Sequence, residues 1–200
     1  GDWGLRAVTW TAQAGMQNIG EPPAGWDTVS AGGISANGKV VVGQIGITGH
    51  RYRGFAWSAE DGYQVLDDPN SGSSFLLASS VSADGRLVVG VGKYHGVGQP
   101  VSWTQEAGIV GLGLLPGAVY GTASGVSADG SVVVGNCLYS LAPPLPEEAF
   151  RWTAAGGIEA LGDLPGGALH SYAADASANG SIIVGGGSSE LGDEATIWDA

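Results

Sequence analysis

Hydrophobic residues occur along this chain in short alternating segments, each bounded by glycine-rich turns. Four such segments follow one another in residues 148–187, and none keeps the 3.6-residue period of a helix over a window of about 11 residues. In the first, Phe150 and Trp152 fall on the same face, because side chains alternate along a strand. We therefore predict four strands, at residues 149–153, 158–161, about 172–177, and in the sequence SIIVG that follows.

This unit recurs along the whole chain. The sequence GVSADGSVVVG at 125–135 has near-copies at 33–43, 80–90 and 175–185. A tryptophan in the first predicted strand recurs with nearly the same period. The spacings are 47, 46, 49 and 46 residues between Trp10, Trp57, Trp103, Trp152 and Trp198. A period of this length is typical of propellers and solenoids. We expect Trp10, Trp57, Trp103 and Trp152 to belong to the structural core.

The repeats predict an all-β fold in a single domain, residues 1–200. Repeat 1 spans about 4–46, repeat 2 about 52–92, repeat 3 about 99–137 and repeat 4 about 148–187, and an extra strand is left at 194–200. Twisted four-stranded sheets bury both faces by stacking around an axis, so we expect a small β-propeller in which the two termini meet in one sheet. An open β-repeat array and a five-bladed ring are the alternatives.

The repeated Ser-Ala-Asp-Gly or Ser-Ala-Asn-Gly sequence is interpreted as a hairpin tip. Its Asn-Gly or Asp-Gly pair would supply the two positive-φ residues of a tight type I′ turn. We therefore expect a structural role, and not metal ligation, for Asn37, Asp84, Asp129 and Asn179.

Composition excludes several classes of function. The net charge of −12 opposes binding to nucleic acid, and no segment has the length of apolar sequence that membrane insertion needs. The lone Cys137 is expected to be a small core residue. No motif for a metal or cofactor is present; calcium is possible, although no calcium-loop sequence supports it.

The sequences EAFRWT, GGIEALGDLPGG and GVSADGSVVVG together resemble the HAF repeat, found in families of predicted extracellular bacterial proteins, some of them similar to autotransporter passengers. The resemblance covers essentially the whole chain and is strongest in repeats 3 and 4. It implies export and an extracellular or cell-surface location in a bacterium. It implies no catalytic residues.

The residues themselves also argue against an enzyme. The three histidines, His50, His95 and His170, are scattered, and no G-x-S-x-G or phosphate-binding motif is present. A hydrolase whose acids come from different blades is a distant alternative.

Candidate ligand-binding residues lie where the loops depart from the repeat. Loops between repeats carry aromatic residues next to cations, a combination that can stack on a sugar ring or hold an acidic group. Trp26 stands in a proline-stiffened loop of its own. The candidates are Arg51, Tyr52, Arg53, Lys93, Tyr94, His95, Tyr139 and Trp26. They favour a non-enzymatic, adhesin-like or lectin-like module that binds a glycan or a surface protein.

The extra strand suggests a second function. Its residues Ala195, Ile197 and Trp198 could pair with the open edge of a neighbouring copy, which would make the chain a structural subunit of a homo-oligomer or filament.

Overall fold

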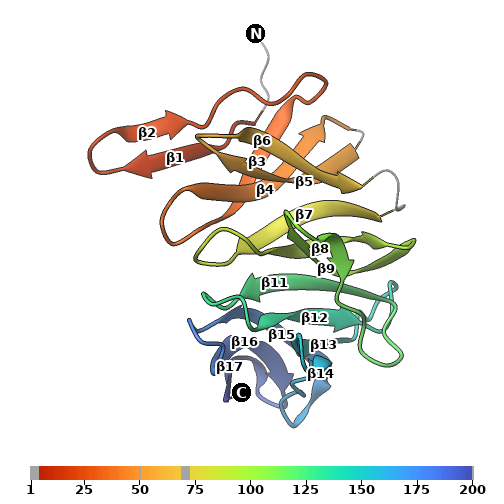
Figure 1. Ribbon diagram of the computed structural model, residues 1–200. Coiled ribbons are helices and arrows are strands. Elements are labelled where there is room, and N and C mark those ends of the chain that lie inside the picture. The colour runs from red at the N-terminus through yellow and green to blue at the C-terminus, as the bar shows by residue number, and fades with distance from the viewer. Residues whose placement is uncertain (1–4, 50, 69–72, 200) are drawn as a thin grey trace.

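A computed structural model describes residues 5–49, 51–68 and 73–199, and every regular element in these ranges is a β-strand. The strands form a curved stack of sheets with the two termini at opposite ends (Figure 1). The fold is therefore all-β, as predicted. The described residues include no helix long and apolar enough to span a membrane.

The N-terminal half contains a two-stranded sheet and an eight-stranded sheet. Its strands are β1 (Val8–Thr11), β2 (Gly15–Asn18), β3 (Thr28–Ile34), β4 (Val40–Ile47), β5 (Arg51–Ser58), β6 (Gly62–Asp68), β7 (Ser73–Val81), β8 (Val88–Tyr94), β9 (Val97–Thr104) and β10 (Gly108–Gly111). Two residue pairs join β6 to β7, whereas the other neighbouring strands share longer ladders. The eight strands therefore divide into a first sheet, β3–β6, and a second sheet, β7–β10.

The C-terminal half forms a seven-stranded sheet. Its strands are β11 (Tyr120–Val126), β12 (Val133–Leu138), β13 (Glu147–Thr153), β14 (Gly157–Ala160), β15 (Gly166–Ala176), β16 (Ile182–Ser189) and β17 (Gly192–Asp199). One parallel pair, Glu147 with His170, joins β13 to β15, so a third sheet, β11–β14, is followed by a fourth, β15–β17.

Each complete sheet straddles two sequence repeats. The strands fall where the alternation predicts them, but a sheet begins with the hairpin that contains the Ser-Ala-Asp/Asn-Gly turn, and the tryptophan strand comes third. Thus β3 and β4 end repeat 1, while β5 and β6 begin repeat 2. Covalent continuity and hydrogen bonding therefore tie every repeat to its neighbours.

The core lies between successive sheets. Phe75 and Val88 of the second sheet pack with Val42 of the first, and Phe150 of the third sheet packs with Val89 of the second. The Val-Val-Gly strands β8 and β12 are buried on both faces because a sheet covers each side of them, whereas Ile182 and Val184 of β16 are exposed. Cys137 is buried in the core between the second and third sheets, and this burial raises the pKa of its thiol.

The repeated turn differs from the type I′ prediction. Gly38 N–H donates to the Ser35 carbonyl at 2.8 Å, and the glycine alone has a positive φ, 71°. The Asn37 side chain accepts hydrogen bonds from Ser35 Oγ and Lys39 N–H. The Asp or Asn is thus selected by its side-chain oxygen, which holds the turn together, and not by a left-handed backbone. The structural role predicted for these residues is confirmed.

These turns also join neighbouring sheets. The Ala83 N–H donates to the Ala128 carbonyl at 3.0 Å, and the Asp129 N–H to the Ala178 carbonyl at 3.2 Å. Gly85 lies on Val40, and Gly180 lies on Val132, so closely that an added Cβ on Gly180 would come within 2.3 Å of a Val132 methyl. Glycine is required here by the packing as well as by φ.

The termini do not meet in one sheet, contrary to our expectation. Within the described residues, β1 and β2 pair with each other, and β17 pairs with β16. The strand predicted as surplus is the third strand of the fourth sheet. The prediction that Trp10 belongs to the core is also wrong: its side chain is 69% exposed, because no complete sheet covers β1. Trp57, Trp103 and Trp152 are half-buried at the margins of the inter-sheet cores.

Candidate functional site

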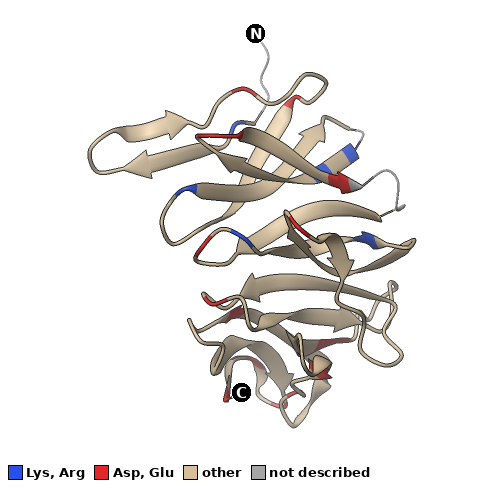
Figure 2. Cartoon of the chain, viewed as in Figure 1, with Lys and Arg blue, Asp and Glu red and all other residues tan. Residues whose placement is uncertain are grey.

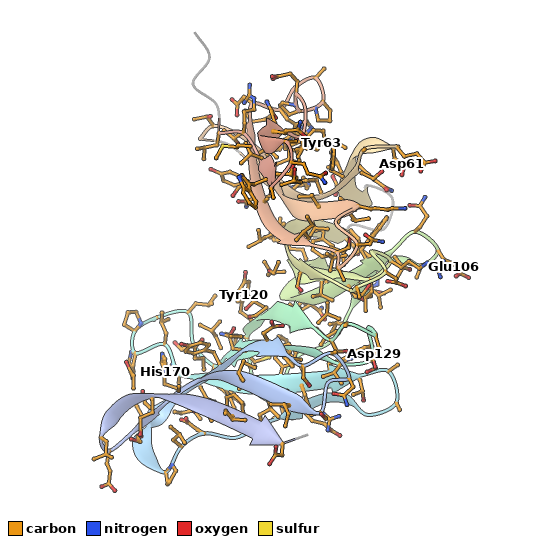
Figure 3. The ribbon with its side chains drawn as sticks, turned by 90° about the vertical axis from the view of Figure 1, so that its left-hand side faces the viewer. Asp61, Tyr63, Glu106, Tyr120, Asp129 and His170 are labelled. Carbon is orange, nitrogen blue, oxygen red and sulfur yellow. The ribbon has the colours of Figure 1, made fainter. Side chains whose placement is uncertain are left out.

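The strands of the stack give it two ends that carry different turns and connections. One end, here called the turn end, carries the Ser-Ala-Asp/Asn-Gly turns and the β5–β6 and β9–β10 turns. The other, the connection end, carries the segments that enter β3, β7, β11 and β15 and the β4–β5, β8–β9 and β12–β13 turns. Figure 3 shows Asp61, Glu106 and Asp129 on one side of the curved stack, and Tyr120 and His170 on the other.

All of the predicted ligand-binding residues lie at the connection end. The Arg51 guanidinium lies 5.3 Å from the ring centroid of Trp26, a cation–π distance. Trp26 is half-buried and packs against the core of the first sheet. Arg53 Nε lies 3.1 Å from Asp67 Oδ2. Tyr52 remains 46% exposed on β5.

Of the residues predicted in the later loops, Tyr94, His95 and Tyr139 make contacts within the chain. The rings of Tyr94 and His95 are 4.3 Å apart, and His95 occupies a left-handed turn position with φ 50°. Lys93 is exposed on β8. The Tyr139 hydroxyl donates to Glu148 Oε2 at 2.6 Å, and burial together with this carboxylate raises the pKa of Tyr139 to about 12.

Two other histidines entered the sequence predictions. His170 lies in strand β15, not in a loop, and its Nε2 is 3.2 Å from Glu147 Oε1. His50 lies outside the described residues.

The turn end contains two clefts, and tryptophans line both. A cleft of about 510 Å³ between the first and second sheets is lined by Trp57, Trp103 and residues of the turns that follow them. We call it the inner cleft. Its base is apolar, with Val40 and Ala56, and its rim carries Asp61, Glu106, Gln64, Gln105 and Arg86.

The second cleft lies between β1 and the first sheet and measures about 970 Å³. We call it the outer cleft. Trp10 and Trp57 line it, so Trp57 belongs to both clefts. Its charged residues are Glu60, Asp61, Asp84 and Lys39. Three tryptophans from successive repeats therefore form a row of aromatic surfaces along the turn end.

One type of turn follows every one of these tryptophans. A Ser or Thr hydroxyl accepts the N–H three residues later, as in Ser58 to Asp61 and Thr104 to Ala107, each at 2.9 to 3.0 Å. A positive-φ glycine closes the turn, Gly62 at 71° and Gly108 at 67°. The same turn occurs after Trp10 and Trp152. These turns fix the backbone next to the clefts.

Two glutamates occupy equivalent positions in these turns. Glu60 and Glu106 each stand three residues after a cleft tryptophan, in the sequences WSAE and WTQE. Both side chains are exposed at a cleft rim, and neither has a salt bridge or hydrogen bond within the described part of the chain. Asp61, in contrast, accepts a hydrogen bond from Ser58 Oγ at 2.9 Å.

The remaining charges do not neutralise these glutamates. Arg86 Nε lies 3.8 Å from Asp84 Oδ2. Asp84 accepts hydrogen bonds from Ser82 Oγ and the Arg86 N–H, and these contacts lower the pKa of its carboxyl, so it stays ionised. Figure 2 shows acidic residues along the whole stack. The turn end therefore presents an aromatic row edged by negative charge.

The sequence predictions missed these clefts. Repetition identified the tryptophans, but alternation along a strand shows only which face a side chain takes and not whether a neighbouring sheet covers it. The signal that could have found the site is the W-x-x-E spacing, which occurs in WSAE and WTQE and is absent from WTAQ and WTAA.

The predicted assembly residues lie on β17. Ile197 pairs with Val184 and is 69% exposed, while Trp198 packs against the core between the third and fourth sheets. Ala195 is exposed and lines a hollow of about 430 Å³ with His170 and Tyr172. No group of three or more metal-ligating side chains occurs within residues 5–49, 51–68 and 73–199.

No protein-family model matches the sequence, and no curated protein matches it. Two solved structures are similar in fold. TolB from Acinetobacter baumannii has a TM-score of 0.59 and 13% identity, over 94% of this chain and 44% of that one. A TolB-like protein from Agrobacterium tumefaciens has a TM-score of 0.60 and 14% identity, over 96% of this chain and 64% of that one.

This likeness concerns the fold alone. TolB contains a β-propeller domain, so the stack of sheets is propeller-like. The chain spans less than two thirds of the length of either structure.

Proposed function

We propose that this protein is a non-enzymatic binding module for glycans, adhesin-like or lectin-like, that acts outside the cell or at the bacterial cell surface. The observation that carries the proposal is the row of Trp10, Trp57 and Trp103 along two clefts. Flat aromatic faces supply large contact areas for the apolar face of a sugar ring, and a few polar groups then fix its orientation. Gln64, Gln105 and Thr104 provide such groups in the inner cleft.

The resemblance to the HAF repeat supports the proposed location, since it implies export. The acidic surface supports the same reading by disfavouring nucleic acid as a partner. Binding without catalysis fits the described clefts, in which polar groups surround an aromatic wall.

The experiment is a glycan array followed by calorimetric titration of the best oligosaccharide. Trp57→Ala and Trp103→Ala should each weaken binding by at least about tenfold, because each removes a central aromatic contact. Trp152→Ala is the matched control: it also removes a half-buried tryptophan from a core margin, but Trp152 lines neither cleft. Equal loss in all three variants, or no glycan bound by the wild type, would contradict the proposal.

A second candidate function is self-assembly, in which copies of this chain are the subunits of a homo-oligomer or filament. The observation that favours it is the apolar surface of the fourth sheet, where Ile197 is 69% exposed and Val184 41% exposed. Within the described residues β17 is also the last strand of its sheet, and such an edge favours pairing with another strand, which would extend the stack into an open array or close it into a ring.

Light scattering over a hundredfold concentration range tests this candidate. Assembly predicts a mass that rises above 20.0 kDa with concentration in the wild type and less in Ile197→Lys. A wild-type mass of 20.0 kDa at every concentration would exclude it.

A further inference from the structure

The two unpaired glutamates of the turn end carry information about the ligand. Glu60 and Glu106 come from successive repeats, and the same hydroxyl-capped, glycine-closed turn holds each of them. Each follows its cleft tryptophan at the same spacing. The chain therefore presents two copies of one arrangement, an aromatic face with an adjacent carboxylate.

The chemistry of this arrangement favours a cation. A positively charged group is attracted to the face of an indole ring, and a neighbouring carboxylate adds Coulombic attraction. The charges around it point the same way. Arg86 Nε lies 3.8 Å from Asp84 Oδ2, and the lining of the outer cleft contains three acidic residues, Glu60, Asp61 and Asp84, and one cation, Lys39. A sugar acid would bring a further negative charge to this rim, which like-charge repulsion disfavours.

We infer that the two Trp-Glu pairs, Trp57 with Glu60 and Trp103 with Glu106, bind an oligosaccharide of amino sugars through its ammonium groups. The inference rests on the proposed glycan-binding function and names the class of glycan. Two equivalent sites on successive sheets suit a polymer that repeats its cation along the chain. The sugar rings contact the tryptophans. Gln64 Nε2 donates to Gln105 Oε1 at 3.2 Å in the inner cleft, and the remaining amide groups of this pair bind ring hydroxyls.

The test uses two hexasaccharides with the same sugar backbone, a glucosamine hexamer that carries free amines and its fully N-acetylated counterpart, which has no ammonium group. Calorimetry at low salt should give at least about tenfold tighter binding of the glucosamine hexamer, because two ammonium–carboxylate contacts contribute in one case only. Added salt should reduce this difference through screening.

Charge-removing variants locate the effect. Glu60→Gln and Glu106→Gln should each weaken binding of the glucosamine hexamer by about fivefold, and should leave binding of the acetylated hexamer unchanged. Both positions are exposed turn residues without partners, so the substitutions preserve the fold. Glu159→Gln, on β14 of the third sheet, is the control and should change neither affinity.

The outcomes separate this inference from the proposed function. Equal binding of the two hexamers, or loss in Glu159→Gln equal to that in Glu106→Gln, overturns the amino-sugar assignment while glycan binding stands. Binding of neither hexamer, with no other glycan bound on the array, overturns both. A hexalysine peptide that binds as tightly as the glucosamine hexamer would also overturn the assignment, since the site would then recognise charge without sugar.

Discussion

The two ends of the stack use similar residue types in opposite ways. At the connection end, the charged and aromatic side chains are largely engaged with one another, as in Arg53 with Asp67 and Tyr139 with Glu148. At the turn end, hydrogen bonds within the turns fix the backbone, while the tryptophans and two glutamates face open clefts. The charged pairs therefore lie mostly in the loops that depart from the repeat, and the tryptophan-lined clefts lie at the repeated turns.

The largest expected effect comes from the glycines that join the sheets at the turn end. Gly180→Ala places a Cβ against Val132 and forces an L side chain to a φ of 69°. We expect it to lower the free energy of unfolding by about 2–5 kcal/mol, the sum of overpacking and left-handed strain. Chemical denaturation of the wild type and of this variant, measured in parallel, gives the effect.

Gly38→Ala is the matched variant. It has nearly the same φ, 71°, and the same turn, but nothing lies within 4 Å of its added Cβ. Strain alone should then cost about 1–2 kcal/mol. If the two variants lost the same stability, contact between the turns would not stabilise the stack.

An intermediate effect is expected for the buried turn hydroxyl of Ser127. Its Oγ accepts the Val132 N–H at 3.0 Å and donates to Asp129 at 2.6 Å. Ser127→Ala leaves a buried N–H without its acceptor, which should cost about 1–3 kcal/mol. Ser131→Ala, which removes an exposed hydroxyl from the same turn, should cost less.

The same variant has a readout in the titration of Asp129. Hydrogen bonds from Ser127 Oγ, then from the Ser131 N–H and Oγ, lower the pKa of Asp129 from 3.8 to about 2. Since the folded value is the lower one, Asp129 stabilises the fold above about 3.8, and this contribution is lost as pH falls toward 2. A carboxyl NMR titration should show the pKa rising toward 3.8 in Ser127→Ala. If the pKa of Asp129 did not change in this variant, the Ser127 hydroxyl would not be the main cause of its lowering.

The smallest effect is expected at the connection end. Arg53→Ala breaks a partly exposed ion pair with Asp67 and should change the free energy of unfolding by less than about 1 kcal/mol. Glycan affinity should stay within twofold of the wild type, because Arg53 lines neither cleft. A large loss of glycan binding in this variant would move the site to the connection end and reverse the comparison.

Much of the fold could be predicted from the sequence. Strand positions followed from alternation, and the sheet-to-sheet stacking followed from the repeat length. The strand at which each sheet begins could not be predicted, because a periodic sequence does not mark a first strand. β5 lies between β4 of the preceding repeat and β6 of its own repeat, and the sequence alone does not show that these strands share a sheet. Closure also depends on the angle between sheets, which no local pattern encodes.

The candidate site was harder to predict than the fold. In the sequence, Tyr139 cannot be distinguished from a ligand-binding tyrosine, yet in the structure its hydroxyl donates to Glu148. Glu60 looks like any surface acid until the sheets bring Trp10 and Trp57 to either side of the same cleft. The outer cleft forms between Trp10 and Trp57 of different repeats, so the W-x-x-E spacing within one repeat can indicate the Trp-Glu pair but not the cleft.

The half-repeat offset between sequence units and sheets affects how such a chain can evolve. A tandem duplication of one unit adds four strands in the order in which they follow one another in a sheet, wherever its breakpoints fall. It therefore inserts one whole sheet. The new copy also receives a strand with its tryptophan, and the turn that follows this strand lies at the same end of the stack. Lengthening by recombination therefore preserves strand pairing and multiplies the aromatic row, without requiring any further change in sequence.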